Sequence, residues 1–169
     1  MSDVQPKVVS TGPKKPHRSA SMMFMINNFI LLILVLVLFR PGRAALADAL
    51  LCGLIMTWVN FFLALGAARL RLWTVRGKWR LAGYPLPMIV AWLFATTSYL
   101  VIFSWIGSCF WKTLFILVLG FGGSMWDLFL HTRFHILKMD RAKPWQLITY
   151  WMALTIAGAV VFLVVHRSA

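Results

Sequence analysis

The sequence predicts an all-α fold, a polytopic transmembrane bundle of five helices, and three observations lead to this class. Of the 169 residues, 61% are hydrophobic and 12% are charged, about half the charged share of a soluble domain. Five stretches are long and apolar enough to cross a bilayer, which takes about 20 residues. The 17 Lys and Arg residues outnumber four acidic residues, all of them Asp, and they alternate between the connections. This composition excludes a soluble domain, and it is too apolar for a disordered chain.

The five spans are expected at about 22–39, 44–66, 82–107, 110–131 and 146–165. The first is the most apolar, and its end favours a retained helix because Arg40 and Pro41 stand where a signal peptide would have small residues. Cleavage of this first span is the alternative. Pro85 and Pro87 fall at the start of the third span, where proline is tolerated. Residues 1–21 are polar and basic and are expected to form a disordered tail before the five-helix domain of 22–169.

The basic residues predict how the bundle is oriented in its membrane. The N-terminal tail and the connections after the second and fourth spans hold 13 Lys and Arg, and the rest of the chain holds four. Because Lys and Arg are retained on the cytoplasmic side, we expect the N-terminus inside and the C-terminus outside, in a bacterial cytoplasmic membrane. These residues are also expected to contact anionic lipid headgroups. They sit in short loops rather than on one folded face, so no nucleic-acid partner is expected.

Small and aromatic residues give further packing expectations. Gly120, Gly122 and Gly123 in the fourth span predict a close-packed helix face, since small residues let helices approach. Cys52 and Cys109 are expected to be packed thiols, with a disulfide as the alternative. Five tryptophans at span ends are expected at the membrane interface, namely Trp73, Trp79, Trp105, Trp111 and Trp145.

The most informative polar cluster lies near the end of the fourth span, where the sequence runs WDLFLHTRFH. Asp127, His131 and His135 follow one another at intervals of four residues, so they project from one face of a helix. A carboxylate and two imidazoles on one stripe would bind a transition metal, or form a proton relay in which Asp127 orients His131. The alternative places the histidines among the lipid headgroups, with Asp127 paired to Arg133 or Arg80.

Other polar residues at membrane depth leave two interpretations each. Asp48 is either an interfacial carboxylate near Arg40 or Arg43 or a functional group within the membrane. The hydroxyls of residues 96–99 either bond to the preceding helical turn or line a polar cavity. Asn60 is placed to form a hydrogen bond between helices.

The second half of the chain resembles a known family. The stretch RGKWRLAGYPLPMIVAWLFATTSYLVI, followed by LGFGGSMWDLFLH, is similar to the membrane carotenoid-biosynthesis protein family. That family contains bacterial and archaeal carotenoid hydratases and is related to small membrane lycopene cyclases. The similarity covers about residues 73–165 and points to five positions, Gly83, Pro85, Trp92, Trp126 and Asp127.

The resemblance implies hydration or cyclisation of a membrane-dissolved isoprenoid by acid catalysis, without a cofactor. Asp127 would be the acid and His131 would reprotonate it. Trp92, Tyr99 and Trp126 would bind the substrate and stabilise a carbocation with their ring faces. The chain departs from the family because it contains no Glu, and because His131 stands where the family tends to have a second Asp.

Two other classes of function stay open. A non-catalytic small subunit or assembly factor, bound to a membrane-protein partner, is the alternative that the missing Glu favours. A transporter or channel ranks last, because it would need polar residues through the full thickness of the bundle. In this sequence the ionisable residues cluster towards one end, with hydroxyls alone near the middle.

Overall fold

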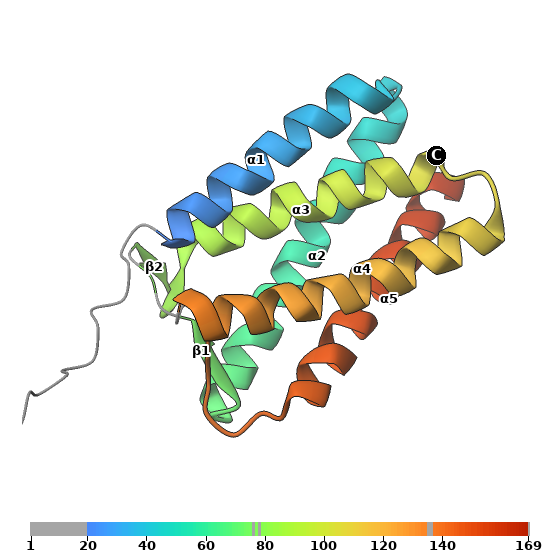
Figure 1. Cartoon of the computed structure of the whole chain (residues 1–169). Helices are drawn as coiled ribbons and strands as arrows, with labels where there is room; N and C mark the ends of the chain where they lie inside the picture. Colours follow the sequence, from blue (N-terminus) through green and yellow to red (C-terminus); the bar gives the residue numbers. More distant parts are fainter. Residues whose placement is uncertain (1–19, 76, 78, 135–136, 169) are drawn as a thin grey trace, which may run out of the picture.

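The computed structural model describes residues 20–75, 77, 79–134 and 137–168, and five long α-helices dominate it (Figure 1). They are α1 (Ala20–Phe39), α2 (Arg43–Arg69), α3 (Leu86–Trp105), α4 (Cys109–Phe129) and α5 (Pro144–Ser168). All five are long and apolar enough to cross a membrane, which confirms the expected number of helices and indicates an integral membrane protein. Of the expected N-terminal tail, residues 1–19 lie outside the described residues, and the last two belong to α1.

Two small antiparallel strand pairs correct the expectation of a purely helical chain. Strand β1 (Trp73–Val75) pairs with β4 (Leu137–Met139), and β2 (Arg80–Leu81) pairs with β3 (Tyr84–Pro85). The second pair is a hairpin whose two-residue turn has positive φ at both positions, 47° at Ala82 and 89° at Gly83, as such turns require. The first pair joins segments far apart in the chain, so periodicity within either segment gave no sign of it.

Two helix boundaries differ from the prediction for a local reason. Helix α3 begins at Leu86 rather than near residue 82, because the hairpin occupies the preceding residues. Helix α4 ends at Phe129, and a five-residue π-helix, η1 (Leu130–Phe134), follows it. The other helices agree with the expected spans to within about three residues.

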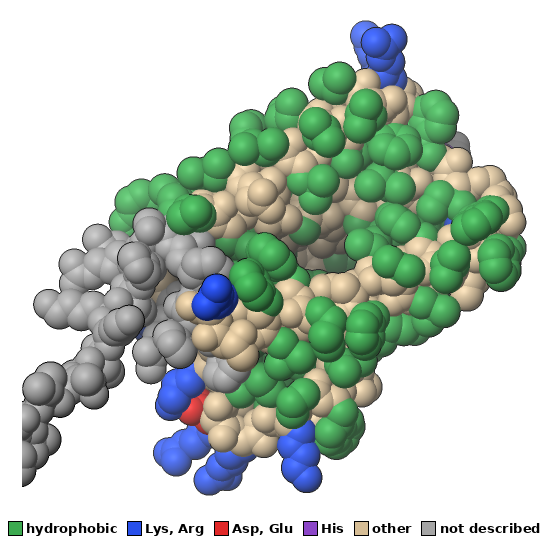
Figure 2. Space-filling view, in the orientation of Figure 1, with side chains coloured by type: hydrophobic (Ala, Val, Ile, Leu, Met, Phe, Trp, Pro, Cys, Tyr) green, Lys and Arg blue, Asp and Glu red, His purple; other side chains and the backbone are tan. Residues whose placement is uncertain are grey.

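The helices form two groups that meet along α2. Helix α3 packs against α1 and α2, whereas α5 packs against α4 and α2 (Figure 1). The strands lie together at one end of the bundle, and Lys and Arg side chains gather there (Figure 2). We call this the basic end, formed by the described residues 69–75, 77, 79–85, 130–134 and 137–143.

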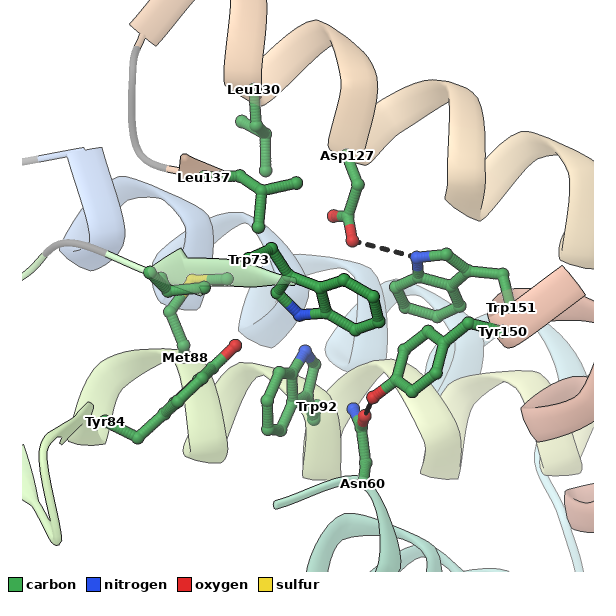
Figure 3. Close-up of a pocket in the computed structure, with 11 residues that line it drawn as sticks. Asn60, Trp73, Tyr84, Met88, Trp92, Asp127, Leu130, Leu137, Tyr150 and Trp151 are labelled. Atoms are coloured by element: carbon green, nitrogen blue, oxygen red, sulfur yellow. Dashed lines mark hydrogen bonds between the residues drawn. The ribbon is translucent and has the colours of Figure 1, made fainter. Parts of the chain in front are cut away.

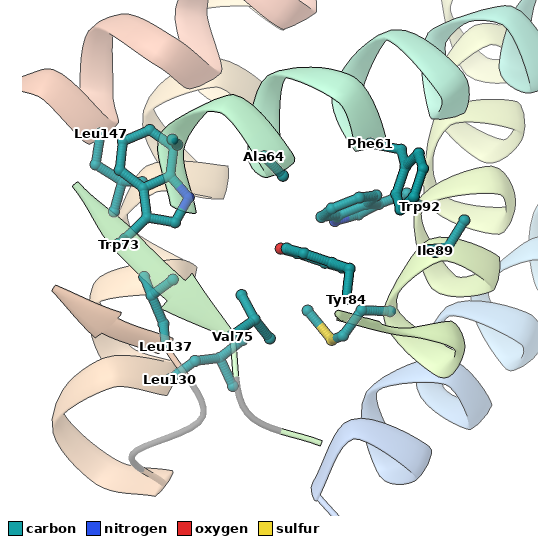
Figure 4. Packing of buried hydrophobic residues seen from close by; sticks show 12 residues of the cluster. Phe61, Ala64, Trp73, Val75, Tyr84, Ile89, Trp92, Leu130, Leu137 and Leu147 are labelled. Atoms are coloured by element: carbon teal, nitrogen blue, oxygen red, sulfur yellow. The ribbon is translucent and has the colours of Figure 1, made fainter. Parts of the chain in front are cut away.

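A buried aromatic and aliphatic cluster closes the bundle towards the basic end (Figure 4). It joins Phe61 of α2 and Ile89 of α3 to residues of β1, β3, β4 and η1. Trp73 belongs to this cluster with only 6% of its surface exposed, so its predicted interfacial position is wrong. Pairing with β4 turns β1 so that Trp73 and Val75 share the buried face. The remaining four tryptophans of that prediction are exposed, namely Trp79, Trp105, Trp111 and Trp145.

The glycines of α4 have different environments. A Cβ at Gly120 would meet Met152, and one at Gly123 would lie 3.0 Å from the ring of Trp151, so these two form the predicted close-packed face against α5. A Cβ at Gly122 would meet no described atom within 4 Å. Both cysteines are free thiols, Cys52 buried and Cys109 exposed.

Candidate functional site

All five helices contribute to one cavity of about 480 Å³, which we call the central cavity. It begins near the basic end, at Phe24 of α1 and Trp126 of α4, and reaches Ile102 of α3 and Phe115 of α4. Its length is about 15 Å, because ten residues separate Trp92 from Ile102 along α3 and a helix rises about 1.5 Å per residue. The cavity therefore spans about half of a hydrocarbon core of about 30 Å.

Most of the cavity wall is apolar, and its polar side chains largely bond to the protein itself. The Tyr99 hydroxyl donates to the Thr155 carbonyl at 3.0 Å, and the Ser98 hydroxyl donates to the Phe94 carbonyl at 2.8 Å. Both interpretations of the hydroxyls at 96–99 thus hold in part, since Ser98 bonds to the preceding turn and also lines the cavity. The wall is suited to a long apolar molecule with few hydrogen-bonding groups.

A much smaller pocket adjoins the central cavity at the basic end, and we call it the aspartate pocket (Figure 3). Its volume of about 20 Å³ is enough for about one water molecule. Asn60, Trp92 and Trp151 line both spaces and separate them. The other lining residues are Trp73, Val75, Tyr84, Met88, Asp127, Leu130, Leu137 and Tyr150.

Asp127 is the acidic group of this pocket. Of the described residues that line either space, it alone carries a carboxyl group. The indole Nε1–H of Trp151 donates to its Oδ2 at 2.8 Å (Figure 3). The close approach of α5 to Gly123 puts the Trp151 ring beside the carboxylate. Within the described part of the chain the ion pairs are Lys138–Asp140 and Asp48–His166, so the alternative pairing of Asp127 with a nearby Arg is not observed.

Five aromatic rings surround the carboxyl group and reach it from four elements. They are Trp73 of β1, Tyr84 of β3, Trp92 of α3, and Tyr150 and Trp151 of α5. Trp73 meets Tyr150 edge-on with ring centroids 5.1 Å apart, and Tyr84 lies against Trp92 at 5.0 Å. Ring faces attract cations, so the pocket combines a carboxyl group with aromatic rings that would stabilise positive charge.

Two tyrosine hydroxyls and one amide complete the pocket. The Tyr150 hydroxyl donates to the Asn60 side-chain oxygen, which realises the predicted hydrogen bond of Asn60 between helices. Tyr84 also lines the pocket, and its hydroxyl points toward the other lining side chains (Figure 3). Burial raises the pKa of Tyr84 well above its ordinary value, and Tyr150 and Asp127 raise it further. The Tyr84 hydroxyl therefore stays protonated and is available as a hydrogen-bond donor.

The structure brings together only part of the predicted site. Asp127 and Trp92 share the aspartate pocket, while Trp92, Tyr99 and Trp126 line the central cavity. His131 lies in η1, next to the pocket residue Leu130, but its side chain lies outside the described residues.

The predicted metal site consists of Asp127, His131 and His135 on one helix face. His135 lies outside the described residues, so the stripe of Asp127, His131 and His135 is not seen whole. Among the described residues, no group of three or more His, Cys, Asp or Glu is placed to hold a metal ion.

Four aromatic residues of the pocket were absent from the hypothesis about the site, namely Trp73, Tyr84, Tyr150 and Trp151. The first two reach the pocket through strand pairing, which left no local pattern. Tyr150 and Trp151 had a usable signal, because both lie within two turns of the start of α5 and Asp127 lies near the end of α4. Because α4 and α5 are antiparallel neighbours, residues near the end of α4 and near the start of α5 lie at a similar level of the bundle.

No family model, curated protein or solved structure matches this chain. The resemblance to carotenoid-biosynthesis proteins therefore stays a prediction. The functional argument rests on the aspartate pocket and the cavity beside it.

Proposed function

We propose that this protein holds the chain of a membrane-dissolved isoprenoid in the central cavity and protonates a double bond at its end from Asp127 in the adjoining aspartate pocket. The end of the substrate reaches Asp127 when the side chains between the two spaces, Asn60, Trp92 and Trp151, move aside. The observation that carries the proposal is the position of one carboxyl group among five aromatic rings, at the end of an apolar cavity bounded by membrane-length helices. The expected orientation, with the basic end in the cytoplasm, would put this chemistry in the inner half of the membrane.

The proposed reaction begins with a proton transfer from the Asp127 carboxyl group to the less substituted carbon of the double bond. The other carbon becomes a tertiary carbocation, which the rings of Trp92 and its neighbours stabilise. In hydration, water adds to the cation and the released proton returns to Asp127. In cyclisation, a neighbouring double bond attacks the cation, and the Asp127 carboxylate then takes a proton from an adjacent carbon. Both routes return one proton to Asp127, and His131, four residues further on, is proposed to relay this returning proton.

Each part of the site has a role in this proposal. The Trp151 indole holds the carboxyl group in a fixed direction through its 2.8 Å hydrogen bond. Tyr99 and Trp126 belong to the wall that holds the rest of the chain-like substrate. The aspartate pocket has room for about one water molecule, which suits hydration.

The test is conversion of an acyclic carotenoid in a heterologous host that makes lycopene. Cells expressing the wild type are expected to accumulate a hydrated or cyclised product, identified by mass spectrometry of extracted pigments. Asp127→Asn keeps the size of the side chain but removes the acid, so conversion should fall by about 100-fold or more. Asp48→Asn is the matched control, because Asp48 pairs with His166 and lines neither space.

Two results would contradict the proposal. Full conversion by Asp127→Asn would remove the acid from the mechanism. An unchanged pigment and lipid profile with the wild type would instead favour the non-catalytic membrane subunit.

A further inference from the structure

The separation of α4 from α1 and α3 leaves an opening in the side of the bundle. Helix α4 packs mainly along α5. Two aromatic pairs bridge the gap, Phe24–Trp126 near the basic end and Tyr99–Phe115 further along, with ring centroids 6.4 Å and 5.6 Å apart. Between these bridges the surface is hollowed, with α1 and α3 on one side and α4 on the other (Figure 2).

The edges of this opening belong to helices that would face lipid. Leu31 of α1 lines the cavity with 41% of its surface exposed, and Gly122 of α4 also lines it and is exposed. The opening therefore lies along the length of helices that are long and apolar enough to cross a membrane, so in a bilayer it would lead sideways into lipid rather than into water.

Gly122 differs from its neighbours in a way that helix packing does not explain. Gly120 and Gly123 allow α5 to pack closely, whereas a Cβ at Gly122 would meet no described atom within 4 Å. The missing side chain at Gly122 does not bring two helices together, and it leaves space at the edge of the cavity.

We infer that the isoprenoid enters the central cavity sideways from the bilayer, between α1 and α4, and that Gly122 determines how wide a chain can pass. This inference rests on the binding part of the proposed function. A linear chain fits between the two aromatic bridges, and a bulky side chain at Gly122 would narrow the passage without disturbing the packing of α4 on α5.

The test measures the rate at which lycopene binds to the purified full-length chain in lipid nanodiscs, through quenching of the fluorescence of the cavity tryptophans. Gly122→Phe is expected to slow binding at least tenfold, and Gly122→Ala to change the rate by less than about twofold. Gly66→Phe is the matched control, because Gly66 is also a helical glycine with no described atom within 4 Å of its Cβ position, but it lies outside the cavity. It should bind lycopene at the wild-type rate.

A second variant keeps the test decisive if Gly122→Phe does not fold. Leu31→Trp narrows the same opening from α1 and should also slow binding at least tenfold. Binding at the wild-type rate by a folded variant narrowed at either edge would overturn the entry route, and so would equal slowing in Gly66→Phe. Failure of the wild type to bind lycopene would instead overturn the proposed function together with this inference.

Discussion

At the scale of single residues, Trp151 both orients the Asp127 carboxyl group and separates the two spaces of the site. Its indole N–H donates to Asp127, and its ring lines both the aspartate pocket and the central cavity. The same ring lies against Gly123, so the direction of the carboxyl group depends on how closely α4 and α5 pack. Orientation of the acid and separation of the two spaces are therefore coupled through one residue.

Trp151→Phe separates these tasks, because it keeps an aromatic ring but removes the hydrogen-bond donor. A hydrogen bond to a charged group contributes about 1.5–3 kcal/mol, so we expect lycopene conversion to fall by about tenfold or more while lycopene binding changes little. Pigment analysis and the fluorescence assay measure the two effects. Trp145→Phe, at an exposed tryptophan of the same helix, should change neither. A fall in binding as large as the fall in conversion would contradict an orienting role.

At the scale of elements, three glycines within one turn of α4 lie on two different faces of the helix. Gly120 and Gly123 face α5, and Gly122 does not. Gly120 faces Met152 so closely that a Cβ would lie 3.2 Å from the Met152 Cα, a backbone atom that does not move aside easily. Gly122 faces the open edge of the cavity. The α4–α5 pair is therefore a specific close packing, while the α4–α1 boundary is left open.

Gly120→Leu should destabilise the protein, because the added side chain forces α4 away from α5. Overpacking of this kind costs about 1–3 kcal/mol. The free energy of unfolding, measured by denaturant titration in mixed micelles, should fall by that amount. Gly122→Leu, two residues away, should leave it within about 0.5 kcal/mol of the wild-type value. Equal losses in the two variants would show that α4 packs differently from the arrangement described here.

At the scale of the whole molecule, charge and thiol chemistry distinguish the two ends of the bundle. The basic end carries most of the described Lys and Arg residues, namely Arg69, Arg71, Arg80, Arg133, Lys138, Arg141 and Lys143. The exposed thiol of Cys109 lies at the other end, at the start of α4, while Cys52 is buried. Chemical labelling of the native Cys109 thiol can therefore report which side of the membrane this end of the bundle faces.

A membrane-impermeant maleimide added to intact cells should label Cys109, because the charge distribution puts the basic end inside. Cys109→Ser should abolish the labelling, since Cys52 is buried. Lys143→Cys in that background places a thiol at the basic end and should react only after the membrane is permeabilised. The reverse pattern, with Lys143→Cys labelled in intact cells, would invert the expected topology.

The sequence predicted about where the helices begin and end. It was less informative about which residues from distant parts of the chain would contact one another. Apolar runs located the five helices to within a few residues, and the spacing around Asp127 singled out a residue that lines the aspartate pocket. Trp73 was misplaced, because its depth follows from pairing with a strand more than sixty residues away. Trp151 was missed for a related reason, since its bond to Asp127 requires two helices to approach at Gly123.

The short central cavity has a consequence for how a molecule with two identical ends would be processed. A cavity about 15 Å long encloses one end of a membrane-spanning chain and leaves the other end in lipid. Under the proposed function, the molecule would have to withdraw after its first end reacts, diffuse and return by its opposite end. Conversion would then be distributive, and a singly modified intermediate would build up in the bilayer before the doubly modified product.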